Sequence, residues 1–315
     1  MFGERMSTEN NVDIIIERIE NLKRRRRAFI LAHSYQKPEV QDIADFVGDS
    51  LEMAKKALEA DADVIIVAGV SFMAEVAAIL NPDKIVLHPD PSAGCPLADF
   101  LTPSIIREAR SRYPNRPVIL YINTYVDSKA LADYIVTSSS TPKLVSKLGH
   151  DEVIFGPDKN LADYVAELTG KTVIPLPPNG CCPVHEYLIS EYHLAESLSK
   201  YPHAKILVHP ETPRNVRKKA DFVGSTSQML KAVDVMPYKE FLLGTEEGLV
   251  YRARKLYPEK IVRPLNPKAI CTNMKKITLL KILKSLEELK PKVNIDRRVS
   301  DRVREIMLTS MEMTR

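Results

Sequence analysis

An internal repeat of about 88 residues is the feature that most constrains how this chain can fold. The tripeptide Ala-Asp-Phe at 44–46 recurs as Ala-Asp-Tyr at 132–134 and as Ala-Asp-Phe at 220–222, each time 88 residues later (132 − 44 and 220 − 132). Hydroxyl residues follow each copy at the same spacing, at Ser50, Ser138 and Thr226. The chain is therefore expected to contain three copies of one structural unit.

Three further sets of residues share this period. Each set places one residue of similar chemistry in each copy, with spacings of 86 to 90 residues: glycines Gly69, Gly156 and Gly244; cysteines Cys95, Cys182 and Cys271; and polar residues His33, Asn123 and His209. The glycines and the polar residues each follow a short apolar run. Chance is a poor explanation for so many features with one period.

Short apolar runs alternate with amphipathic stretches through all three copies. The runs predicted to be buried parallel strands are 28–33, 63–69, 84–89, 117–123, 151–157, 171–177, 204–210, 240–246 and 260–264. Alternation of strand and helix is typical of α/β layers with parallel sheets. The fold predicted is three homologous three-layer αβα units around a pseudo-threefold axis, at residues 12–98, 99–185 and 186–272.

The remaining residues, 273–315, read as terminal helices. They are expected to pack back on the first unit, with Leu279, Leu280, Ile282 and Leu283 on the buried side. Periodic apolar residues also predict a helix from Val12 that ends in the basic run 23–27. Cations complement the dipole at a helix end, so this run is interpreted as a solvated helix terminus. The alternative, a phosphate-binding patch, lacks aromatic or further basic partners nearby.

Composition excludes several classes of protein. Net charge is +4, from 45 basic and 41 acidic residues, which is too mild to indicate a nucleic-acid partner. The sequence has no apolar run long enough for a membrane span and no signal-type apolar core near its start, so a cytoplasmic location is expected. In a reducing compartment, the four cysteines are expected to be thiols or metal ligands.

Polar residues after the strands are candidates for a ligand site. In parallel sheets, ligands bind beyond the carboxyl ends of the strands. The candidates there are His33, Tyr35, Tyr121, Asn123, His209 and Glu211. Ser50, Ser138 and Thr226 precede helices, where a hydroxyl can bind a carboxylate or phosphate. Each alone could instead cap its helix, and Asp45, Asp133 and Asp221 are expected to be structural turn or cap residues.

One cysteine in each copy suggests a shared metal centre. Three thiolates on a threefold axis can hold three irons of a [4Fe-4S] cluster, which leaves the fourth iron without a protein ligand. That iron could act as a Lewis acid on a substrate oxygen. Taken singly, Cys95 or Cys271 would more often be a small buried residue than a ligand. No C-x-x-C spacing occurs, which excludes a ferredoxin pattern or a zinc ribbon.

Read in order, the motifs resemble those of the quinolinate synthase family. They run from AHSYQKPEVQDIADFVGDSLEMAKKA (32–57) through GVSFMAE, YINT, TSS, FGPDKNLADYVA, CPVHE, HPE and GST to ICTNMKKITL (270–279). The resemblance covers nearly the whole chain. It implies three α/β domains around one [4Fe-4S] cluster and condensation of iminoaspartate with dihydroxyacetone phosphate to quinolinate, phosphate and two waters. An aspartate-oxidising enzyme is the implied source of iminoaspartate, within de novo NAD biosynthesis.

The resemblance also implies residue roles. Cys95, Cys182 and Cys271 would be the cluster ligands; Cys182 is preferred over Cys181 because it directly precedes Pro-Val-His. The residues implied to bind substrate are His33, Ser50, Tyr121, Asn123, Ser138, His209, Glu211 and Thr226. Tyr35 and His185 match the active-site tyrosine and the second-domain histidine of the family. Ser34 and Thr212 depart from the commoner Asn and Cys without touching a ligand position.

Glu211 is the strongest candidate for a general base, with His33, Tyr35, Tyr121, His185 and His209 as further groups for proton transfer. The alternative is a salt-bridging glutamate at the start of the helix near Arg214. Two other functions remain open. One is a cluster-bearing redox or iron sensor without turnover, and the other is a hydro-lyase of the aconitase type.

Overall fold

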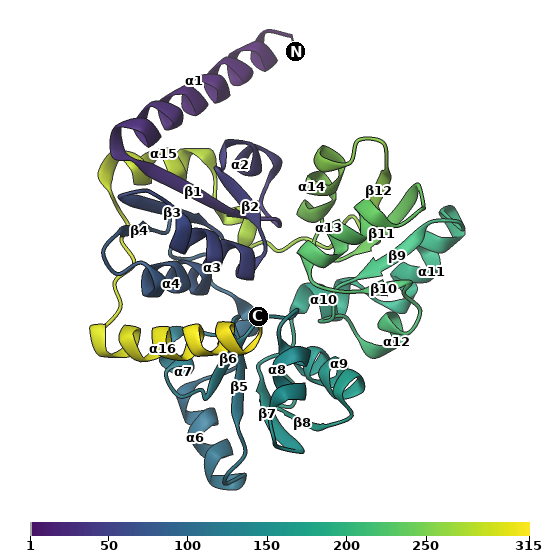
Figure 1. The fold of residues 1–315 in the computed structure, drawn as a ribbon. Helices are drawn as coiled ribbons and strands as arrows, with labels where there is room; N and C mark the ends of the chain where they lie inside the picture. The colour runs from purple at the N-terminus through teal and green to yellow at the C-terminus, as the bar shows by residue number, and fades with distance from the viewer. Residues whose placement is uncertain (1) are drawn as a thin grey trace. The chain divides into compact units, whose positions relative to one another are not determined.

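Three four-stranded parallel sheets dominate the computed structural model, which describes residues 2–315, with side chains from residue 12 onward (Figure 1). The strand orders are β2-β1-β3-β4, β6-β5-β7-β8 and β10-β9-β11-β12, which is one order repeated three times along the chain. The predicted α/β class with three homologous units is therefore confirmed. Two compact units contain these sheets: residues up to Gly94 with Thr272–Ile295, and Cys95–Cys271 with Asp296–Arg315.

The first sheet is buried on both faces. Its strands are β1 (Ala28–His33), β2 (Phe46–Gly48), β3 (Val64–Ala68) and β4 (Ile85–Leu87). Successive strand residues point to opposite faces. Ile30 and Ile66 join a core cluster with Ile19 and Ile282, which come from helices before and after the sheet. The two helices that follow β2 and β3 contact each other and the strands.

The helices of the first unit are α1 (Phe2–Arg26), α2 (Pro38–Ile43), α3 (Ser50–Glu59), α4 (Ser71–Leu80), the short η1 (Met274–Lys276) and α15 (Leu279–Glu288). Helices α1 and α15 lie side by side. Leu279, Ile282 and Leu283 are buried as predicted, but Leu280 is 62% exposed. The prediction for Leu280 is wrong because it falls about 100° from the buried stripe of α15.

The second sheet begins the other unit. Its strands are β5 (Val118–Tyr121), β6 (Tyr134–Val136), β7 (Glu152–Gly156) and β8 (Thr172–Pro175). Its helices are α5 (Pro96–Asp99), α6 (Pro103–Arg112), α7 (Val126–Lys129), α8 (Thr141–Lys147) and α9 (Lys159–Thr169). Three of these helices start with Pro at the first or second position, where its missing N–H costs nothing.

The third sheet follows in the same unit. Its strands are β9 (Lys205–Val208), β10 (Phe222–Val223), β11 (Glu240–Gly244) and β12 (Ile261–Pro264). Its helices are α10 (Pro183–Leu188), α11 (Glu191–Lys200), α12 (Arg214–Arg217), α13 (Thr226–Val235) and α14 (Gly248–Leu256). Ile206, Val208 and Leu242 form its core with Val216 and Ile189.

The last helix, α16 (Arg297–Met313), does not pack where it was predicted to. Helix α16 lies against strand β6 and helix α7 in the second unit, whereas α15 packs against α1 in the first unit. Strand β6 is an edge strand, and the Ser310 hydroxyl accepts the N–H of Ile135 at 3.0 Å. Helix α16 therefore covers an edge that would otherwise expose unpaired backbone groups. The predicted unit boundaries remain a prediction.

The repeated aspartates have one structural role in all three sheets. Asp45, Asp133 and Asp221 each accept a backbone N–H from the adjacent central strand through a carboxylate oxygen, at 2.8 to 2.9 Å. Each also donates its own N–H to the carbonyl of the same partner residue, which is Ile30, Val118 or Ile206. The predicted turn role is confirmed, and these bonds start the short strands β2, β6 and β10.

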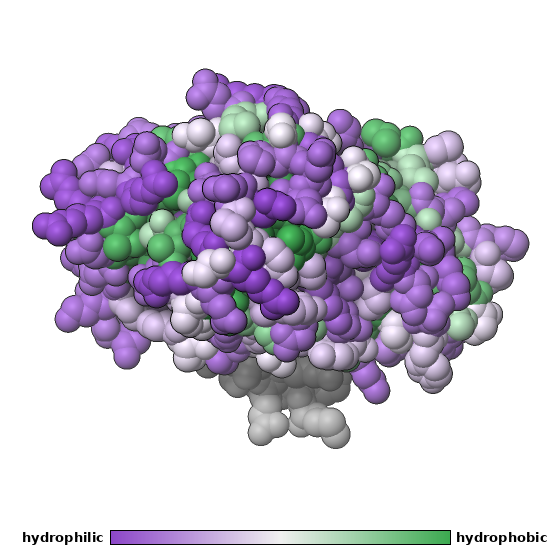
Figure 2. Space-filling view, turned by 90° about the horizontal axis from the view of Figure 1, so that it is seen from below, coloured by the Kyte–Doolittle hydropathy of each residue, from purple (hydrophilic) through white to green (hydrophobic). Residues whose placement is uncertain are grey.

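The surface is mixed in polarity. On the face drawn in Figure 2, hydrophobic residues form separate groups among hydrophilic ones. Among the described residues, no helix combines the length and the apolar character that crossing a bilayer requires.

Candidate functional site

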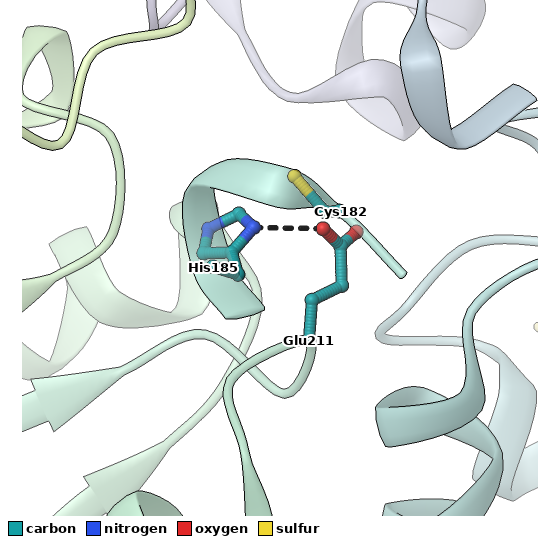
Figure 3. A group of neighbouring side chains, drawn as sticks. All are labelled: Cys182, His185 and Glu211. Carbon is teal, nitrogen blue, oxygen red and sulfur yellow. Dashed lines mark ion pairs between the residues drawn. The ribbon is translucent and has the colours of Figure 1, made fainter. Parts of the chain in front are cut away.

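Glu211 lies at the centre of a buried polar cluster in the second unit. It follows β9 in the loop before α12, and its side chain is 3% exposed. Tyr121 donates its hydroxyl hydrogen to Oε1 of Glu211 at 2.7 Å, and Nδ1 of His185 lies 2.8 Å from Oε2. Figure 3 shows the His185 ring, on α10, directed at the Glu211 carboxyl group, with Cys182, the residue before α10, beside them. Strands β5 and β9 and helix α10 thus bring together three predicted site residues.

The alternative role for Glu211 at a helix start is wrong. Arg214, the first residue of α12, forms ion pairs with Asp163 and Glu167 at 3.1 Å. The Glu211 side chain instead contacts Tyr121, His185 and His209. It is therefore a buried carboxyl group in a polar cluster and not part of a surface ion pair.

The electrostatic surroundings of Glu211 favour its charged form. Burial by itself raises the pKa of this carboxyl group, because the charged form loses its hydration. The electrostatic effect of His209 and His185, the hydrogen bond with His185 and the Tyr121 hydrogen bond outweigh burial and lower the pKa to about 2. Glu211 is therefore a carboxylate at neutral pH and can accept a proton.

The two histidines of this cluster are stacked. The rings of His185 and His209 lie 4.7 Å apart at an angle of 22°. Nε2 of His185 lies 2.9 Å from the Thr245 hydroxyl, so both of its ring nitrogens have polar neighbours. Nδ1 of His209 accepts the backbone N–H of Glu211 at 3.3 Å.

The same local arrangement occurs in the first unit. Nδ1 of His33 accepts the N–H of Tyr35 at 3.2 Å, and the two rings meet edge to face at 4.6 Å. His33 is buried, and Tyr35 is partly exposed. The His33–Tyr35 pair is related to the His209–Glu211 pair by two repeats (209 − 33 = 176), so the repeat holds both histidines in one orientation.

Buried side chains hold the loops that carry Tyr35 and Glu211 through hydrogen bonds to main-chain carbonyl groups. Gln41 donates to the carbonyl groups of Ser34 and Gln36 at 3.1 and 2.9 Å. Arg217 occupies the equivalent position two repeats later (217 − 41 = 176) and donates to the carbonyl groups of Pro210 and Thr212 at 3.4 and 2.6 Å. The loop that carries Glu211 is therefore held by bonds to its main chain, which fixes the direction of the side chain.

The repeated hydroxyl residues do not cap the helices that follow them. Asp49 and Ser225, one residue earlier, are the N-caps of α3 and α13, each within a capping box. Ser50 and Thr226 are instead the first helical residues. The Thr226 hydroxyl is buried without a hydrogen-bond partner among the described residues. A buried hydroxyl of this kind is available to a ligand, which favours the anion-site interpretation over the cap.

Ser138 and Asn123 lie beyond the ends of β6 and β5. In the turn before α8, the N–H of Thr137 donates to the Ser140 hydroxyl at 2.9 Å, and Ser138 is itself buried. Asn123 Oδ1 is also buried without a hydrogen-bond partner among the described residues. The second sheet therefore offers a hydroxyl group and an amide oxygen at its carboxyl edge, as the sequence predicted.

The three repeated cysteines lie close together in the second unit. Cys95 and Cys182 immediately precede α5 and α10, and Cys271 follows β12. Burial first, and then the charge of Cys271, raise the pKa of the Cys95 thiol to about 12. Burial first, and then the charges of Glu211, Cys95 and Cys271, raise the pKa of Cys182 well above its usual value. The Cys95 thiol thus responds to Cys271, and the Cys182 thiol responds to both Cys95 and Cys271.

Cys181 belongs to different surroundings. It is buried, and its pKa is raised by burial and by Glu186, while a hydrogen bond with the Tyr187 side chain opposes the rise. Cys182, in contrast, responds to Glu211 and the other two repeated cysteines. The two neighbouring thiols therefore respond to different charged groups.

This donor set fits a metal centre. Thiols with raised pKa values, such as those of Cys95 and Cys182, stay protonated unless a cation compensates the charge of the thiolate, and metal binding supplies that compensation. Three thiols without a fourth suit three corners of a cube-type cluster. A second possibility is one ion on Cys182, His185 and Glu211, whose ligand atoms all lie within 4.8 Å of one another. The three-cysteine set is favoured, because Oε1 of Glu211 already accepts the hydrogen bond from the Tyr121 hydroxyl.

Three polar side chains beside the cysteines were missed by the sequence analysis: Tyr125, Asp158 and Glu246. Each accepts the backbone N–H of one repeated cysteine. Asp158 and Glu246 lie 88 residues apart (246 − 158), so the repeat contained a signal for them. It was hidden because the first repeat has Val70 at the equivalent position.

Together, fold and site define a three-repeat α/β protein with polar side chains beyond its strand ends and thiol, imidazole and carboxyl groups that could hold a metal ion. Residues 17–312 match the protein family described as Quinolinate synthetase A protein. Over 301 residues the chain is 52% identical to the quinolinate synthase of Pyrococcus abyssi, covering 95% of this chain and 99% of that one. It is 47% identical to the quinolinate synthase of Pyrococcus furiosus over 304 residues, covering 96% and 99% of the two chains. That of Thermotoga maritima is 47% identical over 299 residues, covering 95% and 99%. The chain belongs to the quinolinate synthase family.

Proposed function

We propose that this chain is an enzyme that condenses iminoaspartate with dihydroxyacetone phosphate to form quinolinate, phosphate and two waters. The observation that carries the proposal is the Glu211 carboxyl group, buried between Tyr121 and His185 next to Cys182. It combines groups for proton transfer with a thiol of the predicted metal site. Family membership supports the same reaction.

Cys95, Cys182 and Cys271 would hold a [4Fe-4S] cluster. When bound, such a cluster supplies a Lewis acid through an iron that has no protein ligand. The overall reaction involves no change of redox state, so the cluster is not proposed to carry electrons. The separate surroundings of Cys181 support its exclusion from the ligand set.

Proton transfer is assigned to the cluster of residues around Glu211. Forming an enamine and expelling two waters both require a base that returns its proton to a leaving oxygen. Glu211 is charged at neutral pH and accepts a hydrogen bond from the Tyr121 hydroxyl, so both groups lie side by side for proton transfer with a bound substrate. His185 and His209 keep this carboxylate in place. We propose Glu211 as the base and Tyr121 as its proton-donating partner.

The anionic groups of the substrates need donors. Iminoaspartate has two carboxylates and the triose has a phosphate. Thr226, Ser138 and Asn123 supply buried polar groups at strand ends, and the Thr226 hydroxyl has no other partner among the described residues. Further binding roles are proposed for His209 in the same unit, and for His33, Tyr35 and Ser50 in the first unit, where the family motifs match.

This function places the chain in NAD biosynthesis. Iminoaspartate is short-lived in water, so an aspartate-oxidising enzyme is proposed to supply it, and the cytoplasm is the proposed location. No nucleic-acid or membrane partner is required for this chemistry.

An anaerobic assay tests the proposal. Reconstituted protein is incubated with oxaloacetate and ammonia, which generate iminoaspartate, together with dihydroxyacetone phosphate. Quinolinate and phosphate are expected in equal amounts. A protein that holds iron and sulfide but forms no quinolinate would indicate a sensor. Turnover of a hydroxy acid in place of quinolinate formation would indicate a hydro-lyase. Glu211→Gln, purified in parallel, is the control for chemistry that does not depend on the site.

A further inference from the structure

Each repeated cysteine has its backbone N–H bound by a polar side chain from another segment. A carboxyl oxygen of Asp158 accepts from Cys182 at 3.1 Å, and a carboxyl oxygen of Glu246 accepts from Cys271 at 3.0 Å. The hydroxyl oxygen of Tyr125 accepts from Cys95 at 3.0 Å. Asp158 and Glu246 are fully buried. All six residues lie in the second unit.

The two carboxyl groups are built in the same way. Each follows a strand-ending glycine by two residues, after β7 and β11, and the two positions are 88 residues apart. The second oxygen of each accepts an N–H at the start of the next helix: that of Leu161 at 2.7 Å for Asp158, and that of Gly248 at 2.7 Å for Glu246. Each carboxyl group therefore links a cysteine to the rigid end of a strand and helix.

In the first repeat, a different type of residue accepts the cysteine N–H. Val70 stands at the equivalent position and has no polar side-chain atom, so it cannot accept a hydrogen bond. The N–H of Cys95 instead reaches Tyr125, which lies after β5 of the next repeat. Unrelated residue types thus accept the cysteine N–H in different repeats. This indicates that the cysteines themselves require the hydrogen bond, and that it is not a remnant of the repeat.

We propose that Asp158, Glu246 and Tyr125 are positioning residues that hold the three cysteines in the arrangement required by the metal centre. The proposal rests on the proposed function for the nature of that centre. A bonded N–H fixes the main chain at the cysteine and, with it, the direction of the thiol. It also keeps that N–H from donating to the sulfur atoms, and hydrogen bonds to sulfur alter the reduction potential of clusters.

The first test needs no metal. Apoprotein is treated with iodoacetamide, and the alkylation rate of each cysteine is followed by mass spectrometry. Asp158→Asn replaces one of the two acceptor oxygens with a donating NH2 group, so the paired bonds to Cys182 and Leu161 cannot both persist. Alkylation of Cys182 should therefore speed up about threefold to tenfold, and that of Cys271 should stay unchanged. Glu246→Gln should do the reverse, and Tyr125→Phe should affect Cys95 alone. This crossed pattern would not arise from a general loss of stability.

The matched control is Asp296→Asn. Asp296 caps α16 by accepting the N–H groups of Arg298 and Val299, but it contacts no cysteine, so the alkylation rates should stay at the wild-type values. Equal acceleration of all cysteines, or no acceleration in any variant, would overturn the proposal. If the two carboxyl variants do not fold, Tyr125→Phe decides the question, because it removes only one hydroxyl group.

The second test uses holoprotein. Each of the three variants should release iron to a chelator about threefold to tenfold faster than wild type, and the reduction potential of the cluster should shift. Unchanged release and potential in all three would also overturn the proposal. A wild-type protein that binds no iron and sulfide would contradict the proposed function instead, while the alkylation pattern would still decide the positioning roles.

Discussion

Oε2 of Glu211 lies 2.8 Å from Nδ1 of His185, and both side chains are at least 97% buried. His185 is fixed on its other side by Thr245, and Glu211 by Tyr121. A carboxylate held this firmly loses little entropy when it accepts a proton from a bound substrate. His185 also lies one helical turn from Cys182, so the predicted base and the predicted metal site share one structural support.

Replacing Glu211 with Gln tests its role as the base. The amide keeps the size of the side chain and can still accept from Tyr121, but it has no basicity. Turnover should fall by about 10²–10⁴-fold, the usual contribution of a positioned base. Iron content and substrate binding should stay close to the wild-type values. Near-normal turnover at full iron content would remove Glu211 from the mechanism.

Thr226 and Ser225 form a matched pair of neighbouring hydroxyl residues. The Thr226 hydroxyl has no partner among the described residues, so Thr226→Val should leave the melting temperature unchanged. Substrate affinity should fall by roughly one to two decades, because a hydrogen bond to a charged group is lost. Ser225→Ala removes the N-cap of α13 and should cost about 0.5–2 kcal/mol of stability with little change in KM. The opposite pattern would make Thr226 the structural residue.

Asp90 should contribute to stability in a pH-dependent way. Burial raises the pKa of this carboxyl group, but Lys281 and Ser92 outweigh burial through hydrogen bonds and lower the pKa from 3.8 to about 2. A lowered carboxyl pKa stabilises the fold above pH 3.8, and that stabilisation is lost as pH falls toward 2. Nζ of Lys281, on α15, lies 2.5 Å from a carboxyl oxygen of Asp90. This ion pair therefore joins α15 to the first sheet.

The measurement for Asp90 is urea unfolding of wild type and Asp90→Asn at pH 5 and pH 2.5. At pH 5 the variant should be less stable by about 1 kcal/mol, and at pH 2.5 the difference should shrink. Asp13→Asn, on an exposed carboxyl group, is the control and should show no such convergence. A stability difference that stays constant between the two pH values would contradict the role of the charged carboxylate.

The longer strands could be predicted because each is a continuous apolar run covered on both faces. Strands β2, β6 and β10 do not stand out as apolar runs, because they contain only two or three residues. They depend on the bonds of Asp45, Asp133 and Asp221 to the neighbouring strand. A sequence pattern shows that these aspartates recur, but it does not show which backbone group each one meets.

The sequence could predict which residues belong to the candidate site, but not how they are arranged in space. Glu211 and Tyr121 are 90 residues apart in sequence, and their hydrogen bond exists only because two sheets pack in one unit. The alternative capping role of Ser50 and Thr226 is wrong, because Asp49 and Ser225, one residue earlier, are the N-caps. Leu280 was assigned to the buried side of α15 because it stands between Leu279 and Ile282, although helical periodicity separates it from their buried stripe.

The central claim is that one cysteine from each repeat holds a shared iron–sulfur cluster. The most direct measurement is iron and acid-labile sulfide in anaerobically reconstituted wild type and in four single Cys→Ser variants. Wild type and Cys181→Ser should each contain about four irons and four sulfides per chain, with broad visible absorbance. Cys95→Ser, Cys182→Ser and Cys271→Ser should lose nearly all of both. Retention of the cluster in Cys182→Ser with loss in Cys181→Ser, or a wild-type protein with one metal ion and no sulfide, would contradict the account.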